Sequence, residues 1–135
     1  MSIVFGSIIL ERYCFESDKF RIIAGEDDNT NPGIYGLELS QWLKQELINL
    51  GYSVQEVLAE DWGWCIICYD KPFLLWVGCQ GQFYDKKLIW SCFVEAEKPL
   101  FRNPLKKIDM KQALDNLNND IFKLLSNNFL LIDCP

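Results

Sequence analysis

Apolar and polar positions follow two different periods along the chain, and these periods predict helices and strands. Apolar residues at spacings of three and four over residues 35–50 predict one helix, with Gly51 placed for a left-handed C-cap. The same period over residues 110–125 predicts a second helix, with Asp109 as its N-cap and Gln112 in the capping-box position. Prolines at both ends of residues 99–104 predict a loop before it.

Runs of β-branched and aromatic residues predict the strands. Residues 2–15 and 20–23, separated by a polar turn, predict an N-terminal β-hairpin, and residues 54–59 predict an approach strand. Residues 62–69, 73–80 and 88–96 predict an antiparallel meander. The first two of these strands are apolar on both faces, which predicts a sheet covered on both sides. Residues 1–135 are thus expected to form a single α+β domain, with a C-terminal amphipathic helix packed on the sheet and residues 129–132 as an edge strand or a packed tail.

A Glu-Asp-Trp-Gly-Trp motif at residues 60–64 stands where the approach strand meets the meander. Strand alternation places Trp62 and Trp64 on the same face as Ile66 and Cys68, which favours burial in the core. Aromatic side chains framed by acids are also typical of protein-binding surfaces. Both interpretations of the motif remain open on the sequence alone.

Charge narrows the choice of partner. The chain has a net charge of −6, and residues 1–70 hold 12 of the acids but only 4 of the bases. Nucleic-acid binding depends on Lys and Arg neutralising phosphates, so no nucleic-acid partner is expected. A cationic protein suits this charge better. The apolar run at residues 3–10 is too short to span a bilayer and lacks a basic segment before it, so neither membrane insertion nor a secretory signal is expected.

The chain contains no histidine, which removes Ser-His-Asp and Cys-His catalysis and His-ligated metal sites. An enzyme would depend on carboxylate, lysine, tyrosine or thiol chemistry. No catalytic residue and no cofactor are assigned, and the protein is predicted not to be an enzyme.

Six cysteines are present, and four of them, at positions 65, 68, 79 and 92, fall in strand-like apolar runs. All six are expected to be free thiols in a reducing cytoplasm. The four in the strand-like runs are expected to act as small hydrophobes. Cys65 and Cys68 have the spacing of zinc and redox motifs. In a strand, however, residues three apart point to opposite faces, so these two are interpreted as structural.

The loop at residues 27–33 invites a calcium interpretation, with Asp27 at position one and Glu38 at position twelve of an EF-hand loop. Pro32 occupies the place where that loop needs glycine, and no metal site is predicted.

In size, acidity and order of elements, and in the acidic and aromatic motif at residues 60–64, the chain resembles small bacterial immunity proteins. These neutralise toxins delivered by contact-dependent or type VI secretion systems. The resemblance implies a cytoplasmic inhibitor whose acidic surface plugs the active cleft of a basic toxin, often a nuclease. The partner-binding residues it would use are the acids of the loop and the motif with one tryptophan: Glu26, Asp27, Asp28, Glu60, Asp61 and Trp62.

Two other functions remain open. A secretion chaperone or adaptor is likewise small, acidic and α+β, but such proteins usually begin with a helix and dimerise. A small carboxylate or thiol enzyme would hold an Asp or Cys with a perturbed pKa in a deep pocket. The oligomeric state is not fixed by the sequence.

Overall fold

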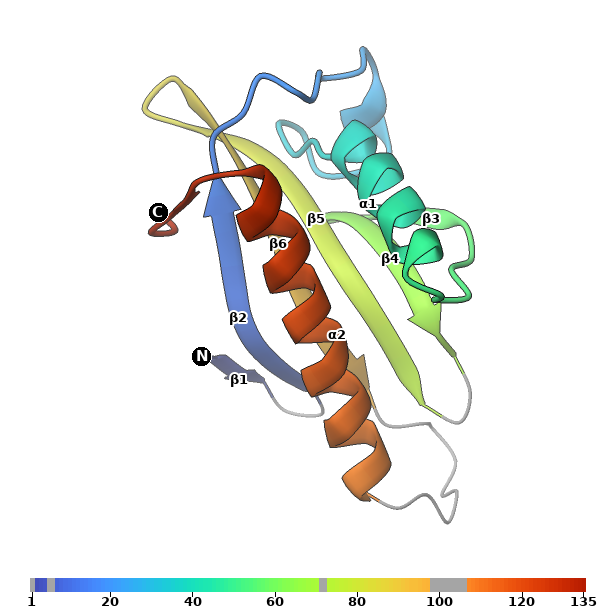
Figure 1. Ribbon diagram of the computed structural model, residues 1–135. Helices are drawn as coiled ribbons and strands as arrows, with labels where there is room; N and C mark the ends of the chain where they lie inside the picture. Colours follow the sequence, from blue (N-terminus) through green and yellow to red (C-terminus); the bar gives the residue numbers. More distant parts are fainter. Residues whose placement is uncertain (1, 5–6, 71–72, 98–106) are drawn as a thin grey trace.

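An antiparallel β-sheet is the frame of the fold. The structure, a computed structural model, describes residues 2–4, 7–70, 73–97 and 107–135. The strands follow the order β1-β2-β6-β5-β4-β3, and β7 pairs with β2 outside this path (Figure 1). Their bounds are β1 Ser2–Val4, β2 Ser7–Phe15, β3 Val57–Glu60, β4 Gly63–Tyr69, β5 Leu74–Tyr84, β6 Lys87–Glu97 and β7 Leu131–Ile132. The α+β class and the single meander β4-β5-β6 match the sequence prediction.

Both long helices lie on the same face of the sheet (Figure 1). These are α1, Leu37–Asn49, and α2, Lys107–Asn128; a short 3₁₀ helix, η1, spans Glu26–Asp28. The predicted apolar stripes form the contact, with these helix residues fully or almost fully buried: Leu39, Leu43, Leu47, Leu114, Leu117, Ile121 and Leu125. Within the described part of the chain, no helix is both long enough and apolar enough to cross a membrane.

One end of each long helix was predicted from the local sequence, and one of these two predictions is confirmed. Gly51 has φ 100, which confirms the left-handed C-cap predicted at this end of α1. Tyr52 and Gly51 donate to the carbonyls of Leu47 and Ile48, and this is the Schellman pattern. Asp109 is not the N-cap of α2, because the helix already includes Lys107 and the residue after it. The loop predicted at residues 99–104 lies outside the described residues.

The predicted N-terminal hairpin is wrong in its second arm. The hairpin is formed by β1 and β2, with Ser2 opposite Ile9. Residues 20–23 are not a strand, because their backbone donors bind carboxylates: Arg21 N donates to Glu38 Oε1 at 3.0 Å. Phe20 turns into the core instead and contacts Trp42, Trp90 and Phe129. Side-chain acceptors thus replace a strand partner here.

The C-terminal segment after α2 forms both structures that its sequence allowed. Leu131 and Ile132 pair with Phe15 and Cys14 of β2 as a short edge strand. The ring of Phe129 stacks on that of Phe15, with centroids 4.2 Å apart.

The hairpin of β5 and β6 is longer than predicted, because β5 continues past residue 80 through Gly81 to Tyr84. Two glycines, Gly78 and Gly81, lie inside β5. A Cβ at Gly78 would meet the ring of Phe93 at 2.4 Å, and one at Gly81 would meet the ring of Trp90 at 2.3 Å. Each glycine therefore makes room for an aromatic ring of the neighbouring strand, on opposite faces of the sheet. The connection shrinks to Asp85-Lys86, both with positive φ.

Replacing Lys86 by glycine is expected to stabilise the protein. Lys86 has φ 68, a conformation that costs a residue with a Cβ about 1–2 kcal/mol, and glycine loses only part of this gain through its more flexible unfolded state. Urea unfolding of Lys86→Gly should show a free energy of unfolding higher by about 0.5–1 kcal/mol. The matched variant Lys87→Gly, one residue into β6, should be less stable than wild type; a gain there would contradict the turn argument.

Candidate functional site

The face of the sheet opposite the helices carries its own aromatic cluster. Among the described residues no helix covers this face, so the prediction of a sheet covered by elements on both sides is wrong for them (Figure 1). The ring of Trp62 stacks on Trp76 with centroids 5.1 Å apart and contacts Phe93 at 5.4 Å. We call Trp62, Trp76 and Phe93 the aromatic shelf. Trp76 and Phe93 are buried, and Trp62 is half-buried at its edge.

Gly63 separates the two tryptophans of the acidic motif onto opposite faces. Its φ is 151, and a Cβ there would lie 2.4 Å from the backbone oxygen of Cys79. Trp62 lies in the turn before β4 and Gly63 has a positive φ, so the alternation of the strand does not extend to Trp62. Trp64 enters the helix-side core, whereas Trp62 joins the aromatic shelf, so the prediction that the two share a face is wrong. Trp64 is therefore a core residue, as the first interpretation of the motif predicts, and Trp62 keeps a partly exposed ring, as the second would require.

Glu26 is an internal residue and not part of a surface. Its side chain is buried, with 3% of the residue exposed. Oε1 accepts hydrogen bonds from Gly36 N at 2.8 Å, from Leu37 N at 3.0 Å and from Trp64 Nε1 at 3.2 Å, while Oε2 accepts one from Ile23 N at 2.8 Å. The carboxylate caps the N-terminus of α1, where negative charge is favoured.

The loop after η1 and the turn before β4 lie side by side, as a common surface requires. Asn31 N donates to the backbone oxygen of Asp61 at 2.8 Å. Asp27 is half-buried and its Oδ2 accepts from Gly33 N at 2.9 Å, so it shapes the loop. Asp28, Glu60 and Asp61 are exposed. Of the six predicted partner-binding residues, these three are exposed, Asp27 and Trp62 are half-buried, and Glu26 is buried.

Three carboxylates gather around Cys65 on the face without helices. Burial, and after it the nearby charges of Glu60, Glu97 and Glu95, raise the pKa of the Cys65 thiol to about 12. Cys65 lies on this face and Cys68 in the helix-side core, which confirms that the pair cannot converge on a metal. Burial also raises the pKa of Cys68 to about 12, so both thiols are neutral at pH 7.

The calcium interpretation of the loop fails on its ligands as well as its sequence. Both carboxylate oxygens of Glu38, at position twelve, accept from Arg21. Within the described ranges, no group of three Cys, Asp or Glu residues could hold a metal ion.

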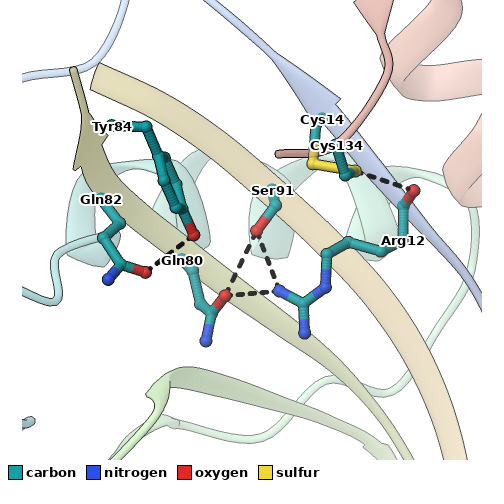
Figure 2. Close-up of a disulfide and its surroundings, with 7 residues drawn as sticks. All are labelled: Arg12, Cys14, Gln80, Gln82, Tyr84, Ser91 and Cys134. Carbon is teal, nitrogen blue, oxygen red and sulfur yellow. Dashed lines mark hydrogen bonds between the residues drawn. A yellow bond between two sulfur atoms is a disulfide. The ribbon is translucent and has the colours of Figure 1, made fainter. Parts of the chain in front are cut away.

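Arg12 is a functional candidate that the sequence analysis missed. Its Nη1 donates to Gln80 Oε1 and to Ser91 Oγ, the latter at 3.2 Å, and its guanidinium lies 4.5 Å from the ring centroid of Phe93 (Figure 2). Gln80 Nε2 donates to the backbone oxygen of Trp62 at 2.5 Å, which ties this network to the acidic motif. An arginine in a strand that was expected to be apolar was the available signal.

Cys14 and Cys134 form a disulfide, so the prediction that all six thiols are free is wrong for these two (Figure 2). Their Cα atoms are 5.2 Å apart, and the bridge holds the C-terminal segment against β2. Cys65, Cys68, Cys79 and Cys92 are free and buried, as predicted. Disulfides form and persist in oxidising compartments, so the reducing cytoplasm is no longer supported by cysteine usage.

Replacing Glu26 by glutamine is expected to destabilise the fold. The amide would direct an N–H at a backbone donor that now binds Oε2, and a buried donor left without an acceptor costs about 1–3 kcal/mol. Chemical unfolding of Glu26→Gln should show a loss of that size. Glu46→Gln, in the helix α1 that Glu26 caps and without such bonds, is the control and should change stability by less than about 0.5 kcal/mol. Equal losses would argue against the cap.

Removing the disulfide is expected to lower stability through the unfolded state. The bridge joins residues 120 positions apart. Disulfides typically contribute about 2–4 kcal/mol, and for a loop this long the lost chain entropy gives about 5 kcal/mol as an upper value. The double variant Cys14→Ser/Cys134→Ser should unfold at lower denaturant than oxidised wild type. Reductant should lower the midpoint of wild type and leave that of the variant unchanged, and an effect on both would point to another cause.

Comparison with known proteins finds no matching family model, no matching curated protein and no matching solved structure.

Proposed function

We propose that this chain is a protein-binding inhibitor that docks a cationic protein through the surface formed by Asp28, Glu60, Asp61 and Trp62, here called the acidic junction. The observation that carries the proposal is the position of Trp62. Its half-buried ring rests on Trp76 and Phe93, directly after the exposed acids Glu60 and Asp61 in the chain, and the backbone of Asp61 binds the neighbouring loop. An aromatic anchor surrounded by polar groups is the usual arrangement of an interface hot spot.

The junction is held in place before any partner arrives. Trp76 and Phe93 support the ring of Trp62, and the side chain of Gln80 binds its backbone oxygen. The loop is fixed to the turn through Asn31 and Asp61. Because these groups are already ordered, binding loses little further conformational entropy, and more of the contact energy appears as affinity.

Charge supports a basic partner. The exposed acids of the junction are part of a chain with a net charge of −6. The electric field of this negative charge accelerates encounter with a positively charged surface. The resemblance to immunity proteins makes a toxin domain the proposed partner, with the junction covering its basic active cleft. Glu26 supports this surface from inside the protein and Asp27 from within the loop.

Thiol chemistry receives less support than binding. Cys68 lines a groove of about 320 Å³ together with Tyr52 and Phe73, but its raised pKa leaves a neutral thiol at pH 7. An activated nucleophile needs the opposite shift.

The expected cytoplasmic location rested in part on free thiols. The bridge between Cys14 and Cys134 removes that argument for two of the six. The proposed binding surface does not depend on the compartment, because neither cysteine belongs to the acidic junction.

Reversing two charges of the junction is expected to slow association. The partner would be isolated from the native host with the wild-type protein as bait, and its binding to purified variants measured by surface plasmon resonance. Glu60→Lys/Asp61→Lys should lower the association rate constant at least tenfold at low salt, and the difference should shrink as salt screens it.

The matched control is Glu16→Lys/Asp18→Lys, which makes the same change of net charge at two exposed acids after β2. It should retain most of the wild-type rate. Equal losses in both double variants would mean that only net charge matters, and an acidic captured partner would contradict the proposal.

A further inference from the structure

The face of the sheet opposite the helices also contains a pocket, which is separate from the acidic junction. This pocket of about 270 Å³ opens between β2, β5 and β6 and is closed on one side by the disulfide-bound tail. Arg12, Gln80, Gln82, Tyr84 and Ser91 line it (Figure 2). This volume equals about nine water molecules, which is room for a small metabolite and not for a peptide.

Arg12 is the one cationic side chain among the residues that line this pocket. In the described part of the chain its guanidinium binds no carboxylate: the ion pairs found there are Arg21–Glu38 and Lys111–Asp115. Its hydrogen bonds go to neutral oxygens of Gln80 and Ser91 through Nη1. The ring of Phe93 supports it from the sheet side at 4.5 Å. A positive charge is therefore held in a fixed orientation without being neutralised.

Among the described residues that line the pocket, the hydrogen-bonding groups that have no partner are mainly donors. Gln80 Oε1 accepts from Arg12 and Ser91, and Gln82 Oε1 accepts from the hydroxyl of Tyr84 at 3.0 Å. In the described structure, Nε and Nη2 of Arg12 and Nε2 of Gln82 donate to no protein acceptor. A site that offers N–H donors and a positive charge selects an acceptor with negative charge. The planar fork of arginine matches a carboxylate with two parallel hydrogen bonds.

We propose that this pocket binds a small carboxylate-bearing molecule, whose carboxylate pairs with the free edge of the Arg12 guanidinium. Ile89 and the disulfide supply the apolar part of the wall, and Gln82 holds the far end of the ligand. The site is independent of the proposed inhibitor function, because its ligand is a small molecule and Arg12 lies outside the acidic junction.

The test is titration of the oxidised full chain with glutarate, followed by calorimetry and by the ¹⁵N-resolved side-chain Nε–H signals of its arginines, with glutaramide as a neutral probe of the same length. Saturable glutarate binding that shifts the Arg12 signal and leaves that of Arg21 in place is expected, together with no binding of glutaramide. Arg12→Lys, which keeps the charge and loses the fork, should weaken glutarate binding at least tenfold, whereas Arg21→Lys should not.

Three results would overturn the proposal. They are the absence of saturable binding at matched ionic strength, equal binding of glutaramide, and tighter binding of inorganic phosphate than of glutarate, which would assign a different anion. All three results are measured on the wild-type protein, so the test does not depend on whether a variant folds.

Discussion

The arrangement of this fold depends on the hydrogen bonds that the buried carboxylate of Glu26 accepts. This carboxylate lies where the irregular segment after β2, the start of α1 and the indole of Trp64 meet, and it accepts a hydrogen bond from each of them. α1 has Gly36 at its N-cap and no cap from its own side chains, so a distant carboxylate supplies what the local sequence lacks. The loop and the turn of the acidic junction are positioned from this one point.

Successive residues of β5 point to opposite faces of the sheet, and the side chains that they meet differ between the two faces. On the helix side its residues contact a continuous core of aliphatic and aromatic side chains, and Trp90 lies over Gly81 without any exposure. On the other face Phe93 lies over Gly78 and carries both the aromatic shelf and the guanidinium of Arg12. A surface with rings, acids and one held cation is thereby supported by a rigid sheet, as recognition requires.

Local patterns in the sequence were sufficient for the elements and insufficient for their surroundings. The α1 C-cap at Gly51 and the buried stripe of α2 could be predicted because both depend on neighbours three or four residues away. The burial of Glu26 could not, because its donors are spread from Ile23 to Trp64. The separation of Trp62 from Trp64 could not be predicted either, because Gly63 lies against the backbone of Cys79, which belongs to another strand. The positions of Arg12 and of the Cys14–Cys134 pair depend on strand pairing across most of the chain, for which the sequence has no local signal.

The disulfide also determines how the protein responds to force. Cys14 and Cys134 bracket both helices and the meander, so the bond closes residues 14–134 into a covalent loop. A pull applied to the two ends of the chain can peel away only the residues outside the bridge, which include β1 and most of β2, and it then passes through the covalent bond. Once those residues are drawn out, the hydrogen bonds between β4, β5 and β6 carry no load while the bond is intact. A machine that unfolds proteins by threading them from one end would meet a closed loop of chain instead of a single strand. Reduction would therefore turn a mechanically shielded domain into one that can be unravelled strand by strand.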